Sequence, residues 1–239
     1  MGRDLAWKRR AGEMAVVVTS ILLAFGIDAA WEARGERADE RAALEALLQE
    51  MTSNRDALER IISVHDSASA RVGAWLRTSP EGIAELLDDD ALVRPPLRLH
   101  NALWAPYTYD PNVGAVRAFV NREGSSSELT EGLRRSTGEW DAKLADTREL
   151  GGVLWESSRD VLALLSYHVV DLAPAEGQGP SVRVIERDYA TRMARARADE
   201  KLVAATIAKS SLQRIYASDL GRLLDMTNAL IATLERELA

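Results

Sequence analysis

The chain has 239 residues and a formal net charge of −7, so it is long enough for one domain with a sizeable core and lacks the basic character of a nucleic-acid-binding protein. It contains no cysteine, which excludes disulfides, thiolate catalysis and cysteine metal sites. Alanine, leucine, arginine and glutamate dominate the composition, and these residues favour helices.

A basic tail over residues 1–10 precedes the most apolar part of the chain, residues 11–31. Met14 to Ile27 carries no charge, and a helix over residues 11–31 would measure about 30 Å, close to the hydrocarbon thickness of a bilayer. We therefore predict a transmembrane helix over 11–31. Lysine and arginine gather before it, which predicts a cytoplasmic N-terminus and places the bulk of the chain on the far side of the membrane.

A cleaved signal peptide is the alternative for this segment, with a small-residue site at residues 24–26. The helical pattern, however, continues past Trp31 without a break. Trp7 and Trp31 bracket the span as interfacial anchors do.

One side of the same segment repeats small residues every four positions and ends in an acid: Gly12, Val16, Ser20, Ala24 and Asp28. Small residues at this spacing let another membrane helix approach closely, and the Asp28 carboxylate would hydrogen-bond across the contact. The simpler interpretation is that small residues are common in such helices and that Asp28 reaches the headgroups.

Residues 32–239 are predicted to form an extramembrane bundle of helices. No Pro lies between Glu36 and Asp66, and no Gly either, while apolar residues recur there at three- and four-residue steps. One long helix is therefore expected from about Ala11 to about Trp75. Its apolar stripe is narrow, so it requires partner helices.

The stretch 91–113 is the least regular part of the chain, because four prolines prevent a long helix. A short helix starting at Ser79-Pro80, with an N-cap serine and a proline at the first helical position, comes before it. One histidine and three aromatic residues on this loop could form a ligand pocket or partner contact, or fold onto the bundle: His100, Trp104, Tyr107 and Tyr109.

Two further helical regions complete the predicted bundle. Ser125 with Glu128 forms a capping-box pattern, and the apolar spacing carries this helix to about Val170. Prolines and glycines predict a loop over 171–182. From Glu186 to the C-terminus apolar residues repeat at helical spacing, which predicts a long helix or a helix pair.

The order of features at the start of the chain is distinctive: Arg9-Arg10, Glu13, the apolar run Ala15 to Ala24, Phe25-Gly26-Ile27-Asp28 and Trp31-Glu32. Over about residues 9–60 this order resembles a widespread bacterial family of uncharacterised proteins, in which one N-terminal transmembrane helix is followed by a long charged helix. The family carries no assigned activity. The resemblance therefore implies an architecture and a location rather than a reaction: a single-pass protein of the bacterial inner membrane whose bulk is periplasmic.

No catalytic motif is recognisable. The histidines His65, His100 and His168 lie far apart and lack the spacing of metal ligands, and neither a nucleophile elbow nor a phosphate-binding loop is present. We therefore predict no catalytic residue, no cofactor and no metal site. His65 completes an apolar stripe and His168 lies on a leucine-rich helix, so both are expected to be packed or interfacial.

These features favour an all-α protein that acts as a non-catalytic accessory or scaffold subunit. It would pack on other transmembrane helices and stabilise a larger respiratory, photosynthetic, transport or envelope complex. Its expected partners are other membrane protein subunits and the lipid bilayer, with association between copies left open and no nucleic acid. A periplasmic sensor or ligand-binding module that acts through a partner is the alternative, and an enzyme is the least favoured class.

Overall fold

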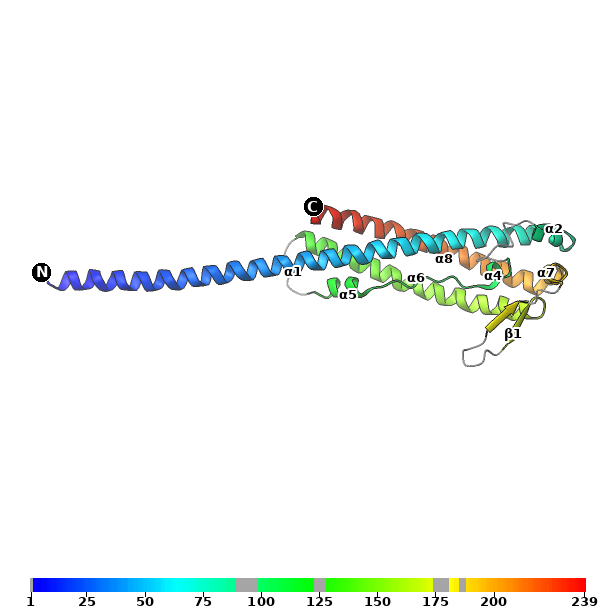
Figure 1. Ribbon diagram of the computed structural model, residues 1–239, viewed down its shortest axis with the longest axis horizontal. Coiled ribbons are helices and arrows are strands. Elements are labelled where there is room, and N and C mark those ends of the chain that lie inside the picture. The colour runs from blue at the N-terminus through cyan, green and yellow to red at the C-terminus, as the bar shows by residue number, and fades with distance from the viewer. Residues whose placement is uncertain (1, 89–98, 123–127, 174–180, 185–187) are drawn as a thin grey trace.

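The computed structural model describes the backbone of residues 2–88, 99–122, 128–173, 181–184 and 188–239, and the side chains of residues 22–87, 99–122, 130–169 and 188–239. Over these residues the protein is an elongated helical bundle with one short β-hairpin (Figure 1). In chain order the elements are α1 (Gly2–Arg77), a 3-10 helix η1 (Pro80–Gly82), α2 (Ile83–Asp88), α4 (Leu99–Trp104), α5 (Gly114–Val120), α6 (Glu128–Ser166), β1 (Val170–Ala173), β2 (Ser181–Val184), α7 (Tyr189–Ala198) and α8 (Glu200–Leu238).

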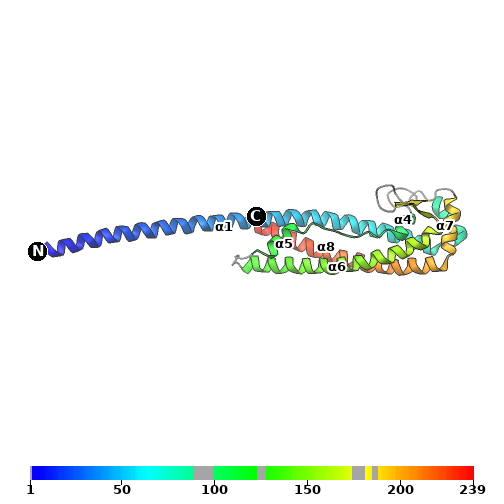
Figure 2. The same cartoon turned by 90° about the horizontal axis from the view of Figure 1, so that it is seen from below.

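Helix α1 is uninterrupted over 76 residues, which is about 114 Å at 1.5 Å per residue. Its second half packs along α8, while its first half extends beyond the bundle alone (Figures 1 and 2). Among the described residues, its polar contacts with the other elements begin at Asp39, whose carbonyl accepts from Arg122 Nη1 at 2.8 Å. The Glu40 carboxylate accepts from the Thr130 hydroxyl at 2.7 Å. The expected continuous helix is confirmed.

The structure does not support the transmembrane helix predicted over residues 11–31. Within the part of the chain that it describes, no helix has a stretch long and apolar enough to cross a membrane. The uncharged run from Met14 to Ile27 is shorter than the about 20 apolar residues that a span requires, and Glu13 and Asp28 close it on both sides. The prediction reached the thickness of a bilayer only by counting flanking residues, and it is withdrawn.

The C-terminal end of α1 is held by α7. The guanidinium of Arg197 donates to the carbonyls of Trp75 and Leu76 at 3.0 and 2.8 Å, which are carbonyls that lack a partner within the helix. The predicted start of the next helix is confirmed at its boundary, because Ser79 is the N-cap of η1 and Pro80 is its first residue. This 3-10 turn leads directly into α2.

The region predicted as irregular contains one short helix. Within 91–113, residues Leu99–Trp104 form α4, and residues 105–113 have no regular secondary structure. The prolines at 95 and 96 lie outside the described residues. So does Ser125 of the predicted capping box, which therefore stays a prediction; the described part of α6 begins at Glu128.

The predicted loop over 171–182 is wrong at both of its ends. Strands β1 and β2 pair there as an antiparallel hairpin, with Val170 opposite Val184 and Ala173 opposite Ser181. Val-Asp-Leu-Ala and Ser-Val-Arg-Val alternate apolar and other residues on either side of a Gly- and Pro-rich stretch, which is a hairpin pattern. The all-α prediction therefore describes the packed core but omits this hairpin.

The core consists of two apolar blocks with a polar layer between them. The first block includes Leu47, Trp140 and Leu223, and the second includes Trp75 and Val161. Between the blocks, all three long helices contribute buried polar side chains, which we call the polar layer: His65 from α1, Ser158 from α6, and Thr206, Lys209 and Gln213 from α8.

Trp140 joins α6 to α8 in the first block. Its ring is fully buried, and its Nε1 donates to the Thr227 hydroxyl at 2.8 Å. Trp140→Ala removes this packing and leaves a cavity, so we expect the free energy of unfolding to fall by about 3–5 kcal/mol. Trp155 on the same helix is 51% exposed, and Trp155→Ala should stay within about 0.5 kcal/mol of the parent. Urea unfolding measures both, and equal losses would contradict this packing.

Candidate functional site

Lys209 is the centre of the polar layer. Its ammonium is fully buried and donates to the Ala102 carbonyl at 3.0 Å and to Gln213 Oε1 at 3.1 Å. Gln213 Nε2 in turn lies 3.5 Å from the His65 carbonyl. Lys209 takes part in none of the ion pairs found among the described residues, and its burial lowers its pKa to about 8.

His65 is a buried, neutral histidine. Its Nε2 lies 2.8 Å from the Tyr107 carbonyl, and because a carbonyl only accepts, Nε2 carries the proton. Nδ1 has no hydrogen-bond partner among the described residues. Burial lowers the pKa of His65 to about 4, outweighing the bond to Tyr107, which raises it. The ring packs edge-on against Tyr107 and Tyr216, with centroids 6.1 and 5.3 Å away.

Two buried tyrosines attach the irregular stretch 105–113 to the bundle. The Tyr216 hydroxyl accepts from the backbone N–H of Tyr109 at 2.8 Å, and the Tyr109 hydroxyl donates to the Asn54 carbonyl at 3.2 Å. Burial raises the pKa of both phenols, so they stay neutral donors and acceptors. The stretch is thereby bonded to α8 on one side and to α1 on the other.

Two polar residues of α1 position the start of α5. The Glu50 carboxylate accepts from the backbone N–H groups of Ala115 and Val116, at 2.9 Å each. It satisfies N–H groups that lack partners at a helix N-terminus, where a negative charge is also favoured. Asn54 Nδ2 donates to the Asn112 carbonyl at 2.8 Å. These groups are therefore engaged in holding the fold.

The four side chains predicted as a ligand or partner loop pack onto the bundle. His100 and Tyr109 are buried, and Trp104 and Tyr107 are half-buried. His100 Nδ1 lies 2.9 Å from the Tyr189 hydroxyl of α7, whereas Tyr107 and Tyr109 lie near His65 and Tyr216. The structure thus divides the predicted group between two neighbourhoods.

Among the described residues, no group of three or more His, Asp or Glu side chains could hold a metal ion. His168, the third histidine, is bonded to the carboxylate of Asp199 at 2.9 Å. Asp199 is also the N-cap of α8, since its other oxygen accepts from the N–H groups of Lys201 and Leu202.

The projecting part of α1 carries a group of exposed large apolar side chains. We call residues 22–31 the apolar segment; its large side chains are 50–69% exposed and are Leu22, Leu23, Phe25, Ile27 and Trp31. Ala24 and Asp28 of the predicted small-residue stripe are exposed as well. The other positions predicted to contact membrane or partner helices lie outside the described side chains: Trp7, Gly12, Val16 and Ser20.

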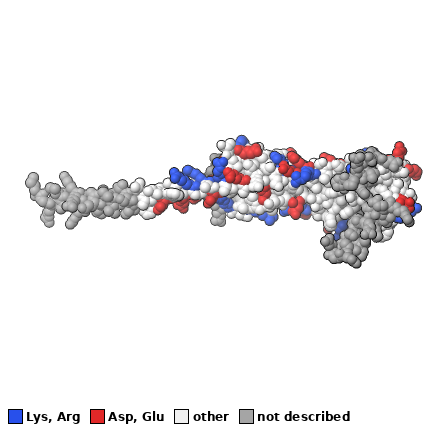
Figure 3. Space-filling view, viewed as in Figure 1, with Lys and Arg blue, Asp and Glu red and all other residues white. Residues whose placement is uncertain are grey.

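The apolar segment is followed by a charged region at the point where α1 meets the bundle. Figure 3 shows an uncharged band on the projecting helix and then mixed positive and negative side chains next to the bundle. Arg34, Arg37 and Arg41 supply the positive charge, interleaved with acids. The surface therefore changes from apolar to charged within a few turns of one helix.

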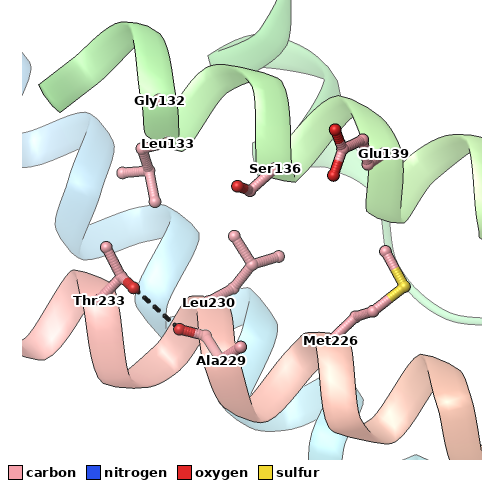
Figure 4. Close-up of a pocket in the computed structure, with 8 residues that line it drawn as sticks. All are labelled: Gly132, Leu133, Ser136, Glu139, Met226, Ala229, Leu230 and Thr233. Carbon is pink, nitrogen blue, oxygen red and sulfur yellow. Dashed lines mark hydrogen bonds between the residues drawn. The ribbon is translucent and has the colours of Figure 1, made fainter. Parts of the chain in front are cut away.

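A groove between α6 and α8 opens near the same end of the bundle (Figure 4). It has a volume of 680 Å³ and is lined by Gly132, Leu133, Ser136, Glu139, Met226, Ala229, Leu230 and Thr233. Small residues are spaced four apart on both walls, a pattern that lets another helix approach closely. This groove cannot be recognised in the sequence alone, because that spacing becomes meaningful only when α6 and α8 lie side by side.

Comparisons of the chain with protein-family models, with curated proteins and with solved structures find no match. The resemblance to a bacterial family with an N-terminal transmembrane helix is therefore corrected. It rested on the order of residues in a short N-terminal stretch, and neither a family match nor a described membrane-spanning helix supports it.

The Lys209 ammonium makes the stability of the bundle depend on pH. Its pKa is about 8 in the folded protein against 10.5 ordinarily, so between these values the unfolded chain binds more protons and stability rises with pH. Relative to Lys209→Met, the parent should gain about 2 kcal/mol of unfolding free energy between about pH 7 and pH 9.5. Lys201 is exposed on the same helix, and Lys201→Met should keep the parental pH dependence.

Urea titrations of the three chains at both pH values measure this effect. Tyrosines of the unfolded chain, with a pKa of about 10, begin to ionise near the higher pH, but they are common to all three chains and cancel in the comparison. A parent whose stability relative to Lys209→Met does not change with pH would contradict the lowered pKa.

Proposed function

We propose that this chain is a non-catalytic scaffold subunit, which binds another protein of a larger complex through the apolar segment of α1. Because α1 is continuous, the segment lies at a fixed distance beyond the end of the bundle. The observation that carries the proposal is the apolar segment itself. Its five large apolar side chains are each at least half exposed, and they lie on the part of α1 that extends beyond the bundle (Figure 1).

Such a surface is typical of a binding site. Extended exposed apolar patches on proteins mark interaction surfaces, and burial of one large apolar side chain contributes about 1.5–3 kcal/mol. At about 100° per residue, Leu23, Ile27 and Trp31 form one stripe, while Phe25 lies on the opposite side of the helix. A helix that is apolar on more than one side is normally buried, so its partners have to cover several sides.

The titratable groups support a structural role for the bundle. Lys209 and His65 have lowered pKa values but are fully buried, so in this structure a substrate has no access to them. Their hydrogen bonds are made to backbone carbonyls and to Gln213. General acid–base catalysis needs a shifted group within reach of the substrate, and these groups instead connect α1, α4 and α8.

Site-specific photo-cross-linking tests the proposal. A photoreactive benzoylphenylalanine in place of Phe25, in the full chain within its native host, should form a discrete adduct with another protein. The same residue in place of Trp155, an equally aromatic and 51% exposed position on α6, should not. Phe25→Glu should lower recovery of the cross-linked protein at least about tenfold, because a charge replaces a buried apolar contact, and Trp155→Glu should leave recovery unchanged.

Two results would count against the scaffold role. Adducts at Phe25 that contain only lipid would show that the segment meets a bilayer instead of a protein. Equal protein adducts at Phe25 and Trp155 would show that the segment is no more a contact surface than the bundle is.

The predicted inner-membrane location stays a prediction, because no described feature tests it. A reporter fused after Ala239, together with fractionation of the host cells, measures it independently of the scaffold role.

A further inference from the structure

We propose that one partner of the apolar segment is a second copy of this chain, and that each copy lays its Leu23–Ile27–Trp31 stripe into the α6/α8 groove of the other. The inference rests on the proposed function, since it uses the same segment as a binding surface. It adds the identity of one partner, the stripe that meets it and the surface that receives it.

The groove has the chemistry and shape to receive a helix. Its floor is formed by Leu133 and Leu230, each 4% exposed. Its walls carry small side chains four residues apart: Gly132 and Ser136 on α6, Ala229 and Thr233 on α8 (Figure 4). Side chains at four-residue spacing on an incoming helix fit between such walls, and the stripe has that spacing.

A chain cannot fill its own groove with its own stripe. The stripe lies 8 to 16 residues before Asp39, so it lies about 12–24 Å beyond the end of the bundle. Helix α1 is continuous across this distance, and folding it back would break the helix. The occupant therefore has to come from another molecule.

The axial positions of stripe and groove match. The α6 wall lies 4 to 11 residues after Glu128, which places it about 6–17 Å inside the same end of the bundle. Two antiparallel copies related by a two-fold axis near that end therefore bring each stripe over the other's groove. The two bundles then point in opposite directions and do not overlap.

The lengths match as well. Residues 2–38 of each copy form about 55 Å of helix, of which about 6 Å lies between the two bundle ends and about 49 Å runs along the other copy's bundle. Helix α6 has 39 residues and is about 58 Å long. The projecting helix thus covers most of the length of the groove face, and a two-fold arrangement closes the assembly at two copies.

Charged side chains of both signs meet in the antiparallel arrangement. With the stripe seated, the second copy's Arg34 falls beside the C-terminal end of α8. Glu235, Arg236 and Glu237 are exposed there, and Arg41 of the same chain donates to the Leu238 carbonyl at 3.3 Å. The opposite side of the projecting helix, which carries Phe25, remains available to the larger complex.

Cysteine pairing tests the geometry directly, because the chain has no cysteine of its own. Full-length Ile27→Cys is mixed with full-length Ala229→Cys and oxidised, and the expected product is a disulfide-linked dimer of the two chains. Ala208 is also exposed on α8 but does not line the groove. Ala208→Cys should give no such product with Ile27→Cys.

A groove-filling variant tests the interface without a disulfide. Sedimentation over a range of concentrations should show a dimer of the parent chain. Ala229→Trp should weaken the dimer at least about tenfold, because the indole occupies the space that the stripe needs. Ala208→Trp should leave the dissociation constant within about twofold, and both positions are exposed, so neither variant disturbs the core.

The outcomes separate this inference from the proposed function. A chain that stays monomeric at all concentrations, while Phe25 still cross-links to another protein, overturns the dimer and leaves the scaffold role standing. A dimer that tolerates Ala229→Trp uses another surface and also overturns the inference. A dimer with the expected cysteine pairing, but no protein adduct at Phe25, supports the paired stripes and removes the evidence for a larger complex.

Discussion

Helix α1 runs without a break along the whole bundle and far beyond one end of it, and this continuity governs the rest of the structure. Each turn of an α-helix is bonded to the next, so the contacts that fix α1 inside the bundle also set the direction of the projecting half. The apolar segment is presented on a rigid rod, and a rigid surface loses little conformational entropy when a partner binds. The same rigidity keeps the segment away from the groove on its own chain.

The polar layer determines how far that rod projects. If the contacts between two long helices were purely apolar, the packing free energy would change little when one helix shifts along the other by one turn, about 5.4 Å. Buried polar groups do not tolerate such a shift, because an unpaired one costs about 1–3 kcal/mol. Lys209, Gln213 and His65 connect α8, α4, α1 and the stretch that follows α4. A buried ammonium disfavours folding, but its bond to the Ala102 carbonyl joins α8 to α4. The contact of Gln213 with the His65 carbonyl joins α8 to α1, so the layer as a whole sets the register of α1 and with it the position of the apolar segment.

Local signals in the sequence predicted the parts of the fold that depend on local physics. Helical spacing of apolar residues and the absence of Pro and Gly predicted the continuous α1, and Ser79-Pro80 marked the start of η1. The candidate site was harder to predict from the sequence. Lys209 lies seven residues from both Leu202 and Tyr216, so its spacing puts it on the buried stripe of α8, but a lysine at such a position usually extends its ammonium to solvent. Only the packing of α1 and α4 against α8 shows that this ammonium is buried. The hairpin was missed because turn-forming residues outweighed its short alternating strands.

The sequence by itself determined that this protein is built from long amphipathic helices, that His65 is packed, and that an apolar stretch lies near the N-terminus. Hydropathy measures a side chain's preference for leaving water, and it does not record which surface receives that side chain. The tertiary structure decided that the described apolar segment stands free on α1, and that small residues from two distant helices form one groove near the same end of the bundle. Such a surface exists only when α6 and α8 lie together, because its two walls are separated by about ninety residues of chain.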